Sequence, residues 1–128
     1  MKVEALYPML TVRDATAAAR FYEEAFEAKV GETHTAPSGQ KVIQLSIQGH
    51  EFYAVDENPQ GFNLSPATLN GTSVRLSLIV DDPDAVAARA VTAGATELFP
   101  VADQPYGMRQ GRVVDPFRHH WLIGRPLT

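Results

Sequence analysis

Two similar segments about half a chain apart constrain the fold more than any other feature of the sequence. One begins at Val12 and reads VRDATAAARFYEEAF, and the other begins at Val80 and reads VDDPDAVAARAVTAG. Each joins the end of a predicted strand to an acidic residue and an Ala-rich helix. A repeat of this kind indicates an internal duplication, in which two small units fold together.

Acidic residues mark the start of both predicted helices. The carboxylates of Asp14 and Asp82 can accept hydrogen bonds from the free N–H groups of the first helical turn. Pro83 suits that turn, where a missing donor costs little. Gly94 is expected just past the end of the second helix, and Glu27 holds the equivalent place after the first. The exit from the first helix is therefore expected to be less regular.

The rest of the chain is predicted to be mostly strands. Period-two alternation predicts strands at residues 6–12, 43–48, 51–55 and 75–80, each with one apolar face and one face that mixes polar and aromatic side chains. The mixed face suits a ligand cavity or a wet surface better than a core. Residues 106–123 predict a strand, a tight turn at Asp115-Pro116 and a returning strand. Residues 57–72 form a Pro-, Gly- and Asn-rich loop, whose Phe62 could fold over a pocket.

Composition excludes several classes of function. The net charge is −4, from 15 acidic and 11 basic residues, and there is no Lys/Arg run, so we expect no nucleic-acid partner. Cysteine is absent, which excludes disulfides and thiolate sites. No apolar stretch is long enough to span a membrane and no signal peptide is recognisable. We expect a cytoplasmic protein.

Four segments of the sequence resemble the vicinal oxygen chelate superfamily, which includes glyoxalases, extradiol dioxygenases and bleomycin-resistance proteins. They read TVRDATAAARFYEEAF, FNLSPATLNGT, VDDPDAVAARAVTAGAT and PVADQPYGMRQGRVVDPFRHHW, and the last is most similar to the PhnB-like branch. The resemblance implies a single α+β domain over residues 1–128, built from two βαβββ modules at about 1–60 and 72–128 with loop 57–72 between them. It also implies a U-shaped sheet around a cavity and a homodimer whose chains exchange modules.

Enzymes of this superfamily hold one divalent metal with His and Glu side chains on the inner strand face, leaving positions open for substrate oxygens. By strand register, the resemblance places the four ligand positions near Tyr7, Tyr53, Arg75 and Leu122. None is a His, Glu or Asp, and at Tyr7, Arg75 and Leu122 a slip of one residue restores no ligand. We therefore predict no catalytic metal at the usual place, and no cofactor.

In the C-terminal segment one residue matches the family pattern, His119, and two depart from it, Arg118 and Met108. His119 matches the family's turn histidine and is expected to make a structural hydrogen bond, while His120 points to the opposite face. Arg118 replaces the usual Gly, which would cost about 1 kcal/mol if the turn needs a positive φ. Met108 replaces an acidic residue, a change that an apolar ligand would favour.

The leading hypothesis is metal-free binding of a small aromatic or planar molecule, which by resemblance to bleomycin-resistance proteins could be an antibiotic held by sequestration. Aromatic rings can stack on planar groups, and Arg75 could pair with an anion or lie over a ring. The candidate ligand-binding residues are Tyr7, Met9, Gln44, Ser46, Tyr53, Phe62, Arg75, Ser77, Tyr106 and Met108.

Three alternatives stay open. The first is a metal-dependent lyase, isomerase or dioxygenase with an unusual site, for example Glu51 with a histidine from a loop. The second is an accessory protein of a biosynthetic pathway. The third is that the inner-face residues only fill a collapsed cavity.

Overall fold

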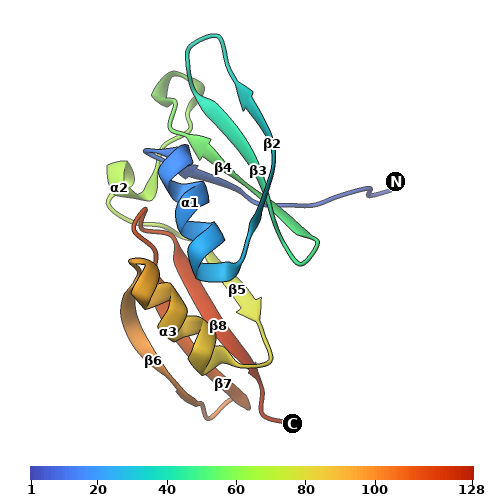
Figure 1. Ribbon diagram of the computed structural model, residues 1–128, viewed down its shortest axis with the longest axis vertical. Helices are drawn as coiled ribbons and strands as arrows, with labels where there is room; N and C mark the ends of the chain where they lie inside the picture. Colours follow the sequence, from blue (N-terminus) through green and yellow to red (C-terminus); the bar gives the residue numbers. More distant parts are fainter.

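The computed structural model describes all residues, 1–128, and shows two four-stranded sheets, each covered by one helix (Figure 1). The first module contains β1 (Met9–Val12), α1 (Ala15–Phe26), β2 (Lys29–Thr35), β3 (Lys41–Ile47) and β4 (His50–Asp56). The second contains β5 (Arg75–Ile79), α3 (Pro83–Ala93), β6 (Thr96–Asp103), β7 (Met108–Val114) and β8 (His120–Pro126). The connection between them holds a short 3-10 turn, η1 (Pro59–Gly61), and the short helix α2 (Pro66–Leu69).

The two sheets have the same topology. Their strand orders are β1-β4-β3-β2 and β5-β8-β7-β6, and in each the first and last strands of the module pair in parallel while the other pairs are antiparallel. The predicted duplication of a βαβββ unit and the α+β class are confirmed. None of the helices has the length and apolar character needed to traverse a lipid bilayer.

Both helices begin where the sequence predicts. Asp14 accepts a hydrogen bond from the Ala17 amide at 3.0 Å, and Asp82 accepts one from the Ala85 amide at 3.1 Å. Each bond satisfies one of the free donors in the first turn of its helix.

Left-handed backbone occurs at five non-glycine residues, and Glu27 and Arg118 are the two for which the sequence raised the question. Glu27 ends α1 with a φ of 56°, whereas Gly94 ends α3 with a φ of 127°. Arg118 has a φ of 70° in the turn between β7 and β8, which confirms that this position needs a positive φ. The arginine costs about 1 kcal/mol there relative to glycine.

The two modules share one hydrophobic core. Helix α1 contributes Phe21, Tyr22 and Phe26, and the Phe26 ring lies 4.7 Å from that of Trp121 on β8. The helices also lie side by side, with Arg89 Nε of α3 donating to the Glu24 carbonyl of α1 at 2.6 Å. Aromatic rings of one module therefore pack directly on the hairpin of the other.

Asp115, in the turn between β7 and β8, is the polar centre of this core and is only 3% exposed. Its carboxylate accepts hydrogen bonds from the Tyr22 hydroxyl at 2.5 Å and from Trp121 Nε1 at 3.0 Å. It also accepts from the backbone amides of Phe117 and His119. Burial, and after it the Asp115 carboxylate, raise the pKa of Tyr22 well above its usual value, so the hydroxyl keeps its proton and stays the donor.

The same turn also reaches the first module directly. His119 Nε2 lies 2.9 Å from the carbonyl oxygen of Thr11 in β1, which is the kind of structural hydrogen bond expected of this histidine. The neighbouring His120 is the first residue of β8, and alternation places it on the face opposite the buried Trp121.

The strands differ from the sequence prediction at the N-terminus and at the sheet edges. Strand β1 begins at Met9, whereas alternation predicted a start at Leu6, which is 95% exposed. The segment before Met9 leaves the body of the molecule (Figure 1), and its last carbonyl, of Pro8, bonds to the Tyr53 amide at 3.0 Å. Strand β2 is exposed along its whole length and β6 along nearly all of it, so neither shows the alternation that predicts a strand.

We predict that Tyr22→Phe lowers the free energy of unfolding by about 1.5–3 kcal/mol, because a buried carboxylate loses one of its donors. Urea unfolding followed by tryptophan fluorescence measures the change. Tyr106→Phe is the matched control, since that hydroxyl bonds to Gln110 at an exposed site, and we expect less than about 0.5 kcal/mol there. Equal losses in the two variants would contradict the central role of Asp115.

Candidate functional site

Each sheet has a helix-covered face and an open face, and the polar side chains gather on the open faces. Helices α1 and α3 lie on the same side of the molecule (Figure 1), against Leu45, Phe52, Val113 and Ile123. Residues one position away on the same strands point the other way. On the first module they are Met9, Gln44, Ser46, Glu51 and Tyr53; on the second they are Arg75, Ser77, Gln110, Arg112, His120 and Leu122.

The open face of the first module carries an aromatic pair beside a polar network. The rings of Tyr7 and Tyr53 lie 4.9 Å apart and are tilted by 40°. Glu51 accepts hydrogen bonds from Gln44 Nε2 and, at 3.4 Å, from the Tyr53 hydroxyl. Strand register places Gln44 directly opposite Tyr53 and Met9 on the other side of it. Two rings and a hydrogen-bonding carboxylate therefore share one small area.

Tyr53 is held as a neutral hydroxyl. Partial removal from water, and after it the Glu51 carboxylate, raise the pKa of Tyr53 above its usual value of 10.0. At neutral pH the group is therefore a hydrogen-bond donor and not a phenolate. It can orient a ligand, but it is poorly suited to act as a base.

The open face of the second module contains a cavity of about 280 Å³. Its lining residues are Arg75, Phe99, Gln104, Tyr106, Gln110, Gly111, Arg112 and Leu122. Gly111 is required for this shape, because a Cβ there would lie 2.7 Å from the Val101 amide nitrogen and 2.8 Å from the Phe99 carbonyl oxygen. The close approach of β6 brings the Phe99 ring within 5.7 Å of the Arg112 guanidinium.

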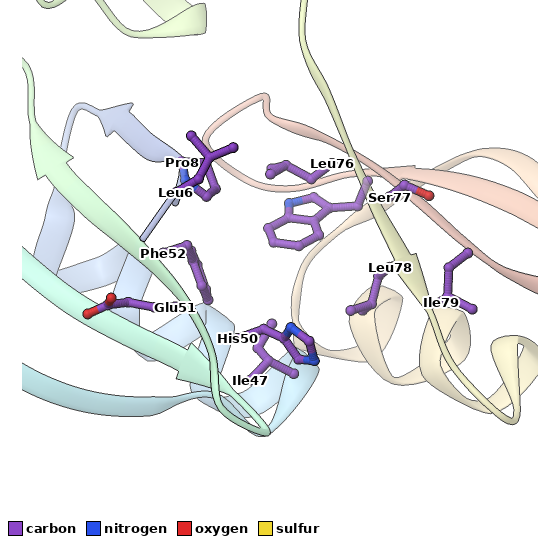
Figure 2. A pocket seen from close by; sticks show the side chains of 11 residues that line it. Leu6, Pro8, Ile47, His50, Glu51, Phe52, Leu76, Ser77, Leu78 and Ile79 are labelled. Atoms are coloured by element: carbon purple, nitrogen blue, oxygen red, sulfur yellow. The ribbon is translucent and has the colours of Figure 1, made fainter. Parts of the chain in front are cut away.

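A larger cleft of about 570 Å³ runs along the seam between the modules. Figure 2 shows Leu6, Pro8, Glu51 and Phe52 on one side of it, and Leu76, Ser77, Leu78 and Ile79 on the other. Most of its lining is apolar, and Trp121 contributes to it. The cleft therefore reaches the shared core, because the buried residues Phe52 and Trp121 line it.

The structure divides the predicted site residues between the two sheets. Five come together on the first module: Tyr7, Met9, Gln44, Ser46 and Tyr53. Arg75, Ser77, Tyr106 and Met108 belong to the second, where Arg75 and Tyr106 line the 280 Å³ cavity. Phe62 is 93% exposed in the loop after η1. A single chain therefore presents two partial sites and does not enclose them together.

Sequence reasoning missed Arg112 and Phe99, and it weighed Glu51 only as a ligand for an unusual metal site. Arg112 could have been found, because the buried residues Gly111 and Val113 flank it and alternation then assigns it to the open face. Phe99 could not, because β6 is irregular, with register shifts on both sides of this residue.

The residues at the superfamily's metal positions do not fit a metal. Tyr7, Tyr53 and Leu122 supply no imidazole or carboxylate, and the guanidinium of Arg75 would repel a cation. No group of three or more His, Cys, Asp or Glu side chains lies close enough to hold an ion. The nearest substitutes, Glu51 and His120, each lie two residues before one of these positions and belong to different modules.

We expect the purified protein to contain less than about a tenth of an equivalent of Fe, Mn, Ni or Zn after expression with all four supplied, because the site offers no suitable donor set. Elemental analysis of the dialysed protein provides the measurement. Close to one equivalent per chain would show that ligands converge in a way that a single chain does not reveal.

His120 is the one imidazole on the open faces whose environment opposes its charge. Its Nδ1 is buried with no hydrogen-bond partner. Burial, and after it the positive charge of Arg112, lower the pKa of His120, while Asp115 raises it and His119 lowers it to smaller extents. The folded protein therefore favours the neutral imidazole.

This environment predicts a pH dependence of stability. The unfolded chain protonates His120 near its ordinary pKa of about 6.5, before the folded chain does, so the unfolded state binds more protons below that pH. The free energy of unfolding should therefore fall between about pH 7.5 and about pH 5.5, and His120→Gln should reduce the fall. Urea midpoints at the two pH values test this. His34→Gln, at an exposed position on β2, should show the full fall; an undiminished fall in His120→Gln would contradict the assignment.

Comparison with known proteins agrees with this architecture. A family model described as a glyoxalase-like domain matches residues 9–123. The chain is 41% identical over 127 residues to an uncharacterized protein of Mycobacterium tuberculosis, covering 96% of this chain and 75% of that protein. An uncharacterized protein of Mycobacterium bovis is also 41% identical, with coverage of 96% and 84%.

Solved structures with the same fold come from plants and bacteria. A gene product of Arabidopsis thaliana is 27% identical with a TM-score of 0.72, covering 95% of this chain and 97% of the other. TioX from a Micromonospora species is 24% identical with a TM-score of 0.71, covering 98% and 100%. The fosfomycin resistance protein FosX from Listeria monocytogenes is 15% identical with a TM-score of 0.73, covering 98% and 95%. The last two are alike in fold alone.

Proposed function

The chain belongs to the family of glyoxalase-like domains, within the vicinal oxygen chelate superfamily, and we propose that it binds a small planar or aromatic molecule without a metal. The observation that carries the proposal is the Tyr7–Tyr53 pair, whose rings lie 4.9 Å apart beside the Gln44–Glu51 network. The rings offer stacking surface, and the amide and carboxylate offer fixed polar contacts. Ligand sites commonly combine a largely apolar surface with a few polar groups in this way.

The proposal includes a homodimer whose two copies exchange modules. Neither open face is closed by the other within one chain. Four apolar side chains near them are at least half exposed: Leu6 at 95%, Met9 at 50%, Ile79 at 55% and Phe99 at 56%. Exposed apolar surface of this kind commonly marks an interaction site. If the first module of one copy faced the second module of another, the two partial sites would become one cavity, and the dimer would hold two such cavities.

Sequestration is the mode of action that this chemistry favours. The open faces offer rings, amides and charged groups for binding, but their superfamily metal positions lack the ligands that metal catalysis requires. By resemblance to bleomycin-resistance proteins, the ligand class would include antibiotics, held in stoichiometric amounts inside the cell. FosX and TioX share only the fold with this chain, so the fosfomycin resistance of FosX does not identify the ligand of this protein.

The competing function is a metal-dependent lyase or isomerase. One observation favours it: Nδ1 of His120 is buried without a partner, and Glu51 occupies the corresponding position in the other module. In an exchanged dimer these two groups could face the same cavity. The metal analysis described above separates this alternative from the binding protein.

We expect Tyr53→Leu to weaken binding of 2-naphthamide, a neutral planar probe, by about tenfold, equivalent to about 1.4 kcal/mol, because the probe loses one stacking ring. Isothermal titration calorimetry measures the affinity, and light scattering on a sizing column measures the oligomeric state. Cyclohexanecarboxamide, which has no planar ring, should bind the wild-type protein more weakly than 2-naphthamide.

Val91→Ala is the control, because Val91 is an exposed apolar residue on α3, on the helix side of the sheet. It should leave both the affinity and the oligomeric state unchanged. The aromatic site would be refuted by equal affinities for the two probes, or by a Tyr53→Leu variant that binds as tightly as the wild type. A monomer at all concentrations would refute the exchanged dimer.

A further inference from the structure

Two positively charged side chains line the 280 Å³ cavity of the second module, and no carboxylate of the chain pairs with either. Arg75 on β5 and Arg112 on β7 flank β8, where Leu122 pairs with Arg112 and the neighbouring His120 pairs with Arg75. Both arginines line the 280 Å³ cavity, and neither makes an ion pair or a side-chain hydrogen bond. Arg112 Nε is moreover buried without a partner.

Two other arginines of the protein do form ion pairs. Arg109, on the opposite face of β7, pairs with Asp84 at 2.7 Å and with Asp103 at 2.9 Å. Arg89 on α3 pairs with Glu27. The contrast between Arg109 and Arg112, only three residues apart on one strand, shows that the open face lacks the carboxylates that the other face supplies.

A buried guanidinium donor without an acceptor is unfavourable unless something else supplies one. The lining of the cavity contains no Asp or Glu. The Tyr106 hydroxyl and the Gln110 amide oxygen are already bonded to each other at 2.7 Å, and Gln104 Nε2 donates to the Gln110 carbonyl at 2.9 Å. The two guanidinium groups are therefore the charged donors left for a ligand, and planar guanidinium groups match oxyanions well.

Aromatic surface lies beside these donors. The Arg112 guanidinium carbon is 5.7 Å from the centre of the Phe99 ring, which is 56% exposed, and the Tyr106 ring is 64% exposed. A planar ligand could therefore rest near a ring while its charged end meets the guanidinium groups.

From these observations we propose that the second module is an oxyanion site, so that the preferred ligand is a planar molecule with a carboxylate or a similar oxyanion, held by Arg112 and Arg75. The inference rests on the proposed ligand-binding function and adds the charge of the ligand. Arg112 becomes a specificity-determining residue: its buried Nε binds the anion, while the exposed Arg75 strengthens the attraction.

The competing occupant is a carboxylate of the protein itself. In an exchanged dimer, Glu51 of a second copy could approach the two arginines. Within its own chain, however, Glu51 already accepts hydrogen bonds from Gln44 and Tyr53. One carboxylate would also leave two guanidinium groups with a net positive charge.

The test compares 2-naphthoate with 2-naphthamide, which share a ring system and differ in charge, by calorimetry on the full-length protein at low ionic strength. We expect 2-naphthoate to bind at least about tenfold more tightly than the amide, and added salt to weaken only the naphthoate. Arg112→Gln and Arg75→Gln should each remove most of this preference, because each weakens binding of 2-naphthoate much more than binding of 2-naphthamide. Arg20→Gln, which removes an exposed charge on α1, should preserve it. Because Arg75 is exposed, its variant keeps the test informative if Arg112→Gln unfolds.

The outcomes separate this inference from the function on which it rests. Equal affinities for the two probes would overturn the oxyanion site and keep aromatic binding. If neither naphthyl probe binds but inorganic phosphate shifts the NMR signal of Arg112 Nε–H, the oxyanion site is supported and the aromatic-binding function is refuted. If neither the probes nor phosphate bind, the oxyanion site and the aromatic-binding function are both refuted. The Glu51→Gln variant removes the carboxylate that could pair with the arginines in a dimer. If 2-naphthoate is preferred only in this variant, Glu51 occupies the two arginines in the wild-type protein and the oxyanion site is overturned.

Discussion

Asp115 lies where helix α1 of the first module meets the last hairpin of the second, and its carboxylate accepts hydrogen bonds from both. Tyr22 donates to it from α1, Trp121 donates from β8, and two amides of the turn complete its shell. A carboxylate this deeply buried is tolerated because four donors hydrogen-bond to it. The two amide hydrogen bonds hold the turn, and the same turn places His119 Nε2 2.9 Å from the Thr11 carbonyl of β1. The last hairpin of the second module is therefore bonded to both α1 and β1 of the first.

The two modules have the same strand topology, but different side chains occupy their helices and open faces. Both modules have the strand order first-last-third-second, yet α1 fills the shared core with aromatic rings whereas α3 buries little beyond Pro83 and Ala90. The open faces diverge further: one carries a tyrosine pair with a hydrogen-bonded carboxylate, and the other carries two unpaired arginines. Equivalent positions in the two sheets thus supply complementary groups. This complementarity is the physical basis for proposing that a second copy brings the two faces together.

Sequence patterns predicted most of the elements and part of the site. Capping residues located both helices, and Asp115-Pro116 located the last hairpin, because these signals depend on neighbours within a few residues. Membership of the vicinal oxygen chelate superfamily is confirmed, while the PhnB-like branch stays a prediction. Alternation failed at β2, β6 and the start of β1, where edge strands lack a buried face to impose it. Among the candidate site residues, Tyr7, Gln44 and Tyr53 lie beside one another, and their role in binding stays a prediction. The close approach of Phe99 to Arg112 depends on a strand irregularity that has no local signature.

The sequence by itself determined the internal repeat, the helix starts and the tight turn, and its resemblance to the superfamily supplied the βαβββ order and the positions at which metal-binding residue types are lacking. The helix starts and the turn follow from local hydrogen bonding and backbone preference, which act over a few residues. Tertiary structure decided which charges are neutralised. Alternation along β7 puts Arg109 and Arg112 on opposite faces, but only the packing of β7 against its neighbours brings Asp84 and Asp103 beside Arg109 and leaves Arg112 in a cavity without a carboxylate. Pairing of charges depends on residues brought together from distant parts of the chain, so it exists only once the sheet has formed.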